Sequence, residues 1–305
     1  MMRLAIYLYV TVFIQTAVFA ENGYQLWQRY APLESKTAKD QYMGLMGNMI
    51  LEVNSPTRAV IRDELKRALR GTLGLDPNFS DASFTGNGVR IDLISKPGIR
   101  EFFSSKTADS LGKEGFVIRR QTGSGQPDRL IISANSDIGL LYGTFHLIRL
   151  MASGTDLSGF HFLSAPKIAL RMLNHWDNLT RTVERGYAGQ SIWNWHTLPD
   201  LIDQRYIDYA RANASIGMNA TALTNVNANA TVLTPMYLQK VKALADVFRP
   251  YGIRVFLTAR FSAPIEIGKL STADPNDPEV AKWWAEKAKE IYELIPDFGG
   301  FLVKA

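Results

Sequence analysis

The sequence predicts an α/β protein in two parts. An N-terminal α/β sandwich domain is expected over residues 21–165, and the first half of a (β/α)8 TIM-type barrel, truncated at its C-terminus, over residues 166–305. Two observations predict this. Strand and helix patterns are mixed in the first part, whereas the second part alternates strand and helix three times and then begins a fourth strand. The strands of the second part are also followed by long loops.

The first part contains two helix patterns with their own start and stop signals. They are a helix from Pro56 to about Leu69, which Asn54 or Ser55 caps and Gly71 or Gly74 stops, and a helix from Ser136 to about Met151. The other predicted segments are a polar stretch with three aromatic residues at 21–40, strands at 50–53, 89–94, 115–120 and 129–133, a hairpin connection at 121–128 and an irregular bridge at 152–165.

The second part repeats a strand–helix unit of roughly 40 residues. The predicted elements are a buried strand at 168–173, a helix at 201–216, a strand at 220–224, a helix at 235–248, a strand at 254–258, a helix at 278–294 that Asp277 caps, and a strand at 300–303.

Two architectures repeat in this way, the doubly wound sheet and the eight-stranded barrel. A dinucleotide-binding sheet would have a short glycine-rich turn after its first strand, but here 27 residues rich in Trp, Asn and His separate Leu173 from Leu201. Long aromatic loops after strands are typical of the active-site face of a barrel. Because a barrel needs about 250 residues, the 140 residues of 166–305 predict about half of one.

The first twenty residues have the pattern of a secretory signal. Arg3 precedes an apolar run from Leu4 to Phe19, and the small residues Ala17 and Ala20 flank the expected cleavage point. The alternative is a membrane anchor, but the run is shorter than the roughly 20 residues that a spanning helix needs. We therefore expect an exported protein, periplasmic or extracellular, with no membrane attachment after cleavage of residues 1–20.

Composition excludes several classes of site. The chain has no cysteine, which rules out disulfides, thiolate metal sites and a cysteine nucleophile. Its four histidines lack the spacing of a metal site, so neither a metal nor another cofactor is expected. The formal charge of +5 comes from scattered residues, so nucleic-acid binding is not expected.

The long loop after the first barrel strand carries the residues best suited to bind a sugar. An indole such as that of Trp176 offers an apolar face to a sugar ring, and His175 and Asp177 can bind hydroxyl groups. Each has a structural alternative: Trp176 as a core or rim aromatic, Asp177 as a loop cap, and His175 as a hydrogen-bonded structural residue. Glu266 is a second candidate carboxylate, because glycoside cleavage needs two.

Later segments at the predicted strand ends add further candidates. Residues 193–196 either line a pocket or pack over the barrel, and packing is the preferred interpretation. Residues 224–227 follow the second strand, Arg260 follows the third, and Lys304 ends the fourth. Two cations near one pocket would suit an acidic sugar, although surface charge is the preferred interpretation for Arg260.

Seven segments together carry a specific pattern. They are GYQLWQRY at 23–30, RMLNHWDN at 171–178, ERGYAG at 184–189, SIW at 191–193, SIGMN at 215–219, TNVNA at 224–228 and GGFLVKA at 299–305. This set resembles glycoside hydrolase family 67. The resemblance covers almost all of the chain after residue 20.

The resemblance implies an inverting α-glucuronidase. Such an enzyme releases glucuronic acid, or its 4-O-methyl ether, from glucuronoxylan-derived oligosaccharides in xylan breakdown. Trp176, Val226 and Lys304 match positions that line the uronate pocket of the family. The resemblance places the catalytic carboxylates beyond Ala305, so the 305-residue chain alone is expected to be inactive. It also implies a helical C-terminal domain, absent from this sequence, that often makes homodimers.

Two other functions remain open at this point. One is a non-catalytic carbohydrate-binding protein that uses the sandwich domain and the aromatic loop. The other is a different barrel glycosidase with a similar front domain, such as a hexosaminidase, which would need a Glu pair in the rest of its barrel.

Overall fold

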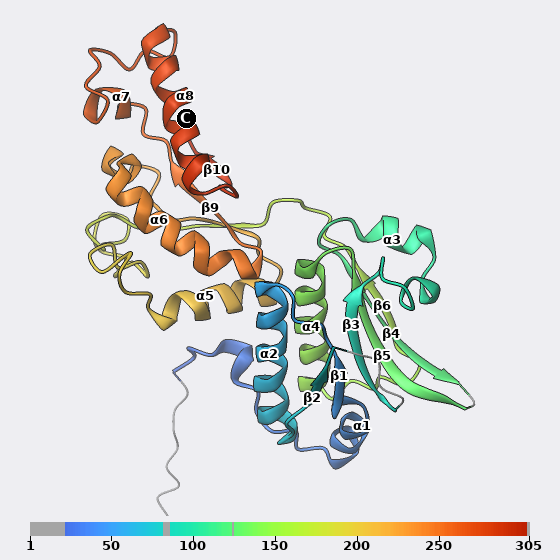
Figure 1. Cartoon of the computed structure of the whole chain (residues 1–305). Helices are drawn as coiled ribbons and strands as arrows, with labels where there is room; N and C mark the ends of the chain where they lie inside the picture. The colour runs from blue at the N-terminus through green and yellow to red at the C-terminus, as the bar shows by residue number, and fades with distance from the viewer. Residues whose placement is uncertain (1–21, 82–85, 124, 304–305) are drawn as a thin grey trace, which may run out of the picture.

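The computed structural model describes residues 22–81, 86–123 and 125–303, which form two β-sheets with helices packed on them (Figure 1). Within these ranges one sheet has six strands and the other has four. The predicted signal segment at 1–20 lies outside the described residues. None of the helices in the described ranges combines the length and the apolar character that crossing a membrane requires.

The six-stranded sheet is formed by the first part of the chain. Its strands, in spatial order, are β2 (Asn78–Ser80), β1 (Asn48–Ile50), β3 (Gly88–Leu93), β5 (Gln126–Ala134), β4 (Phe116–Gly123) and β6 (His161–Ser164). The first four pair in parallel, and β4 is antiparallel to both of its neighbours. The connection predicted to form a hairpin is therefore the one between β4 and β5.

Two helices of this part start and stop where their local signals predict. The helical segments described here are η1 (Leu26–Arg29), α1 (Lys36–Met46), α2 (Pro56–Leu73), η2 (Arg100–Phe102), α3 (Ser105–Leu111) and α4 (Asp137–Ala152). The Ser55 hydroxyl accepts the N–H of Arg58 at 3.2 Å to cap α2, and Gly74 ends it with a φ of 68°. Ser136 caps α4 in the same way, by accepting the N–H of Gly139.

The sheet is covered on both faces. Ile118 and Ile132 belong to the main core that α2 and α4 fill, whereas Val117 and Ile131 belong to a smaller cluster with Leu111 of α3. Because successive residues of a strand point to opposite faces, consecutive apolar residues in β4 and β5 serve both layers. The first part is thus an α/β sandwich.

Two segments of this part differ from the sequence-based expectation. The prediction of an irregular bridge at 152–165 is wrong at its end, because β6 pairs with β4 there, with Phe116 opposite Ser164. The side chains of β6 alternate between exposed and half-buried, so the strand has no apolar run that would reveal it. Helix α1 was not predicted, since polar residues interrupt its buried positions Ala38, Tyr42 and Leu45.

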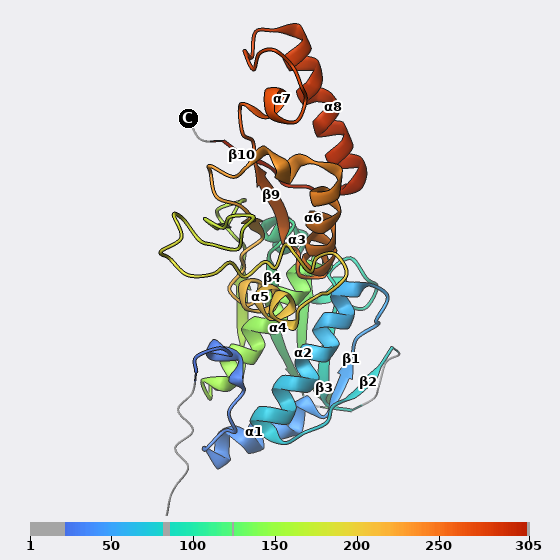
Figure 2. The ribbon, with the colours of Figure 1, turned by 90° about the vertical axis from the view of Figure 1, so that its left-hand side faces the viewer.

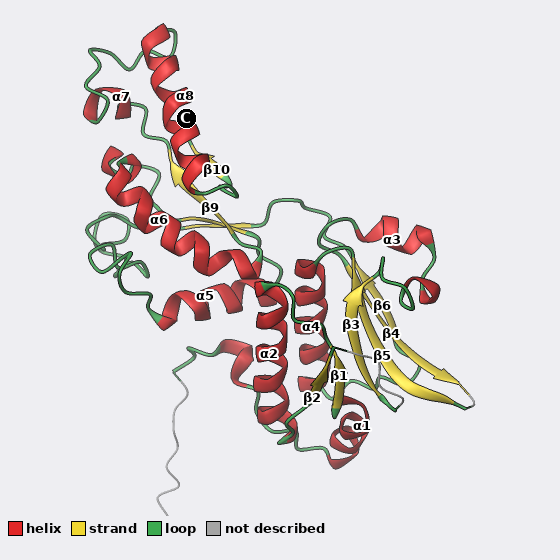
Figure 3. Cartoon of the chain, viewed as in Figure 1, coloured by secondary structure: helices red, strands yellow, loops and turns green. Residues whose placement is uncertain are grey.

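The second part forms a parallel sheet in the order β7, β8, β9, β10, and at least one helix follows each of the first three strands. Figure 3 shows the helices α5, α6, α7 and α8 of this part. The elements are β7 (Met172–Asn174), α5 (Gln204–Ser215), β8 (Ala220–Ala222), η3 (Ala230–Leu233), α6 (Pro235–Phe248), η4 (Arg249–Tyr251), β9 (Arg254–Thr258), α7 (Ala263–Glu266), α8 (Pro278–Leu294) and β10 (Gly300–Leu302). Each strand is added beside its predecessor without reversal, as in a barrel and unlike a doubly wound sheet. Figure 2 shows α6 and α8 on the same side of β9 and β10.

The first barrel strand is shorter and more exposed than predicted. The prediction of a buried strand at 168–173 is wrong, because β7 covers only 172–174, and Ile168 is 67% exposed. Within the described residues β7 pairs only with β8, so one edge of the strand has no neighbour. An apolar run in sequence predicts burial only if a partner element covers it.

The two parts share one hydrophobic core and are joined by polar contacts. The carboxylate of Glu64 on α2 is 2% exposed and accepts two hydrogen bonds from the guanidinium of Arg211 on α5, each 2.8 Å long, and one from Tyr30. A second contact pairs Arg171 with Glu114 at 2.5 Å. These contacts fix the sandwich against the barrel strands.

Candidate functional site

A pocket of about 490 Å³ lies at the carboxyl ends of β7 and β8. In a barrel this is the face on which the strand-end loops build the active site. The pocket is lined by residues from the loops after these two strands: Trp176, Asn178, Glu184, Arg185, Asn225, Val226 and Asn227.

The pocket brings together two of the three residues that the sequence resemblance singled out. Trp176 and Val226 lie 50 positions apart in the chain and both line it. Trp176 is 44% exposed, which excludes a core position and leaves two interpretations, a sugar-binding residue and a rim aromatic. The third residue, Lys304, lies outside the described residues.

Asp177 organises the loop rather than facing the pocket. Its side chain is buried and accepts a hydrogen bond from the hydroxyl of Ser191 at 2.5 Å, and its backbone carbonyl accepts the N–H of Asn225 at 2.8 Å. The Ser191 hydroxyl in turn accepts the N–H of Trp193. These bonds tie the loop after β7 to the loop after β8, so the geometry favours the cap interpretation of Asp177 over the catalytic one.

His175 lies beneath the same loop in a mostly buried position. Its Nε2 is 2.8 Å from the hydroxyl of Tyr209, and its Nδ1 is 3.9 Å from the carboxylate of Asp177. Burial lowers the pKa of His175 below its ordinary value, and the Asp177 carboxylate opposes this effect. The ring therefore favours its neutral form, as a structural residue does.

This lowered pKa predicts a pH dependence of stability. The unfolded chain protonates His175 near pH 6.5, where the folded chain still resists protonation. The contribution of His175 to the free energy of unfolding should thus be constant above about pH 7. It should decrease as the pH is lowered through about 6.5, by at most about 1.4 kcal/mol per pH unit. Urea unfolding of wild type and His175→Gln across this range measures the difference. Identical slopes in the two proteins would contradict the prediction.

The aromatic segment 193–196 packs rather than lines the pocket. Trp193 is 0% exposed and contacts the rings of His175, Tyr209 and Phe248, and Trp195 is also buried. The preferred interpretation as packing is therefore correct for the two tryptophans, whereas His196 is exposed.

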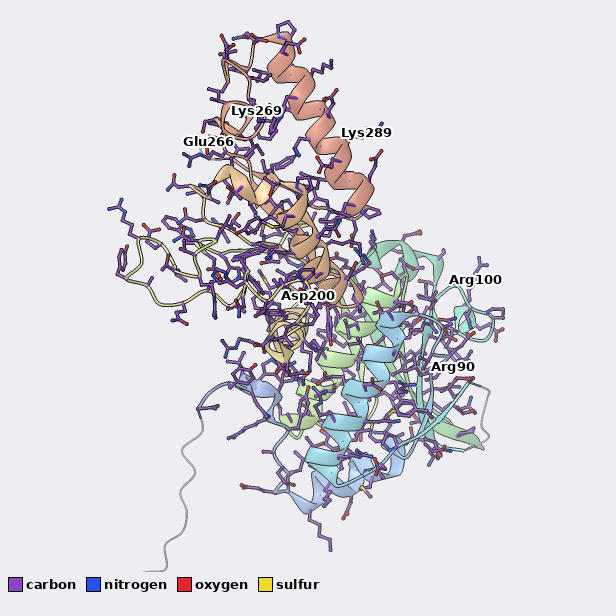
Figure 4. All side chains as sticks on the ribbon, turned by 60° about the vertical axis from the view of Figure 1, so that its left-hand side comes forward. Arg90, Arg100, Asp200, Glu266, Lys269 and Lys289 are labelled. Atoms are coloured by element: carbon purple, nitrogen blue, oxygen red, sulfur yellow. The ribbon has the colours of Figure 1, made fainter. Side chains whose placement is uncertain are left out.

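Arg260 and Glu266 neutralise one another. The guanidinium Nε of Arg260 lies 2.5 Å from Glu266, and hydrogen bonds from Ser262 and Arg260 lower the pKa of that carboxyl group. Neither residue lines the pocket, and Figure 4 places Glu266 near Lys269 in the outer segment around α7. Arg260 thus has the surface-charge role that its position predicted.

Sequence reasoning missed the charged residues of the pocket. Glu184 and Arg185 line it but were quoted only as part of the ERGYAG segment. A Glu–Arg pair before Gly186 resembles many surface loops, so the local sequence gave no reason to select it. Across the described ranges, no group of three or more His, Asp or Glu side chains is arranged to hold a metal ion.

Comparison with known families accounts for both parts of the chain. Residues 26–147 match the N-terminus of glycosyl hydrolase family 67, and residues 150–305 match the middle domain of the same family. The chain belongs to glycosyl hydrolase family 67. The predicted resemblance is confirmed, and the pocket at the strand ends lies within the middle domain of the family.

The curated relatives that match this chain are longer proteins. The chain is 35% identical over 300 residues to the alpha-glucuronidase of Hypocrea jecorina, a match that covers 94% of this chain and 35% of that protein. It is 34% identical over 313 residues to alpha-glucuronidase A of Emericella nidulans, a match that covers 98% of this chain and 35% of that protein. The chain thus spans about a third of the length of these relatives.

Solved structures confirm the predicted fold class. A GH138 enzyme targeting pectin rhamnogalacturonan II superposes with a TM-score of 0.57 at 19% identity, over 83% of this chain and 30% of that one. CpGH84D superposes with a TM-score of 0.52 at 12% identity, over 83% of this chain and 39% of that one. These likenesses, together with the order of the parallel strands, support a sandwich followed by part of a barrel.

Proposed function

We propose that this family 67 chain forms the sugar-binding side of an α-glucuronidase site, and that its ligand is the glucuronic acid or 4-O-methylglucuronic acid of glucuronoxylan-derived oligosaccharides. The observation that carries the proposal is the pocket in which the half-exposed Trp176 faces the loop of Val226. The indole and the valine provide apolar surface for a sugar ring, and Arg185 provides positive charge for its acid group. The curated relatives named alpha-glucuronidase support this choice.

The described pocket is suited to binding more than to cleavage. Glycoside hydrolysis uses two carboxyl groups on either side of the scissile bond. Among the described residues that line the pocket, Glu184 is the one carboxylate, and Asp177 is buried behind the loop. We therefore expect the 305-residue protein to bind the acid sugar without turning over aldotriouronic acid. Release of glucuronic acid by the purified protein would contradict this expectation.

Binding measurements test the proposed function directly. The intrinsic fluorescence of the 305-residue protein, titrated with glucuronic acid, should show saturation, with a weaker response to xylose and glucose. A stronger response to N-acetylglucosamine would favour a hexosaminidase instead. Sequencing the coding region downstream of codon 305 separates an enzyme from a non-catalytic binding protein, because an enzyme requires carboxylates at the following strand ends.

The same proposal includes export. The apolar run at 4–19, which follows Arg3 and precedes a small-residue cleavage point, supports a secretory signal, and xylan is an extracellular polymer. Expression with residues 1–20 should yield a mature N-terminus near Glu21 outside the cytoplasm. Recovery of the intact chain in the cytoplasm would contradict this.

Replacement of Trp176 by alanine should weaken sugar binding without unfolding the protein. Loss of the stacked aromatic surface should reduce the binding free energy by roughly 1.5–3 kcal/mol. This corresponds to at least about a tenfold loss of affinity for glucuronic acid. The melting temperature should hardly change, because the ring is 44% exposed. Calorimetric titration and a thermal melt measure both quantities. Tyr187→Ala is the control, since Tyr187 is 77% exposed in the same loop and does not line the pocket.

A further inference from the structure

The backbone of Glu184 has an unusual conformation at the edge of the pocket. Its φ is 56°, in the left-handed region that residues with a Cβ adopt only at a cost. Two hydrogen bonds hold it there: its N–H donates to the carbonyl of Trp176 at 2.8 Å, and its own carbonyl accepts from the Asn178 amide at 2.7 Å. The loop therefore holds the backbone of Glu184 against that of Trp176, and both residues line the pocket.

Among the residues that the structure describes, none donates a hydrogen bond to the side-chain carboxylate of Glu184. It is 17% exposed and lines the pocket, and within the described residues its charge partner is Arg185, whose Nε lies 3.6 Å away. That distance is too long for a hydrogen bond. The neighbouring amides differ, because those of Asn178 and Asn225 donate to backbone carbonyls of the pocket loops.

We propose that Glu184 binds the substrate by accepting hydrogen bonds from hydroxyl groups at the edge of the sugar that stacks on Trp176. A carboxylate has two oxygens and can accept from two neighbouring hydroxyls at once. This inference rests on the proposed function, and it assigns the recognition of hydroxyl groups to a different residue from the recognition of the acid group.

The alternative role for Glu184 is to neutralise Arg185. The two roles predict opposite results for Glu184→Ala. If Glu184 binds hydroxyl groups, the variant should lose affinity for glucuronic acid and for methyl glucoside alike, by at least about tenfold, since hydrogen bonds to charged groups are the stronger ones. If it only neutralises Arg185, the variant should bind glucuronic acid more tightly and methyl glucoside as before.

The experiment is calorimetric titration of wild type, Glu184→Ala and Glu184→Gln with both sugars. Glu184→Gln keeps one acceptor oxygen and should lose less affinity than the alanine variant. Glu293→Ala is the control, because Glu293 is an exposed glutamate of α8 that lies 3.8 Å from Lys289, and it should bind like wild type. A thermal melt of each variant verifies that it is folded.

The outcomes separate this inference from the function on which it rests. Failure of wild type to bind glucuronic acid would overturn the proposed function. Binding by wild type together with unchanged or tighter binding by Glu184→Ala would overturn the role of Glu184 alone. Equal loss for both sugars, with partial retention in Glu184→Gln, is the result we expect.

Discussion

Arg211→Met is expected to unfold at a temperature roughly 5–15 °C below that of wild type, because it leaves a buried carboxylate without its cation. Glu64 is 2% exposed and receives two hydrogen bonds from the Arg211 guanidinium. Breaking one side of such a pair costs about 3–5 kcal/mol. The pair joins helix α2 of the sandwich to helix α5 of the partial barrel. Loss of the pair should therefore loosen the contact between the two parts.

Two further variants make this prediction specific. Arg67 lies 3.9 Å from the same carboxylate but is 49% exposed, so Arg67→Met should cost less than about 1 kcal/mol. Glu64→Gln combined with Arg211→Met removes both charges and keeps an acceptor for Tyr30, so it should melt above Arg211→Met alone. Differential scanning calorimetry measures all three. Equal melting temperatures for Arg67→Met and Arg211→Met would show that the buried ion pair contributes no more to stability than the exposed one.

Trp193→Ala is expected to have a comparable effect on stability. The indole is 0% exposed and packs on His175, Tyr209 and Phe248, and truncation of a buried tryptophan costs about 3–5 kcal/mol. Its N–H makes no hydrogen bond within the described residues, so the loss comes from the cavity rather than from a stranded partner. Urea unfolding gives the free energy.

The comparison with Trp176→Ala tests the assignment of the two tryptophans. Trp193→Ala should lower stability, and Trp193→Phe should lower it less because part of the ring remains. Trp176→Ala should lower sugar affinity and leave stability nearly unchanged. If both alanine variants lost stability to the same extent, the distinction between the packing and the binding tryptophan would be wrong.

The elements that the sequence predicted most closely are those with local signals. Helix α6, strand β9 and helix α8 have the predicted bounds at 235–248, 254–258 and 278–294. Proline at the first turn and an aspartate cap act within a few residues of the helix start, so the sequence alone contains them. The order of the repeats likewise predicted a barrel, and the seven segments predicted the family.

The candidate site was predictable only in part. Trp176 and Val226 were selected through the family resemblance, and the parallel order of β7 and β8 brings them together. Glu184 was not selected, because its place in the pocket depends on a backbone conformation and on hydrogen bonds to Trp176 and Asn178. The residue types of a polar loop do not predict such a backbone conformation.

By itself, the sequence determined the fold class, most helix and strand positions, and the family. Only the tertiary structure decided that 168–173 is exposed or half-buried rather than buried, that β6 pairs with β4, and that Glu64 meets Arg211 across 147 positions. The physical reason is that capping and periodicity act over a few residues, whereas burial and ion pairing depend on which distant segment packs alongside.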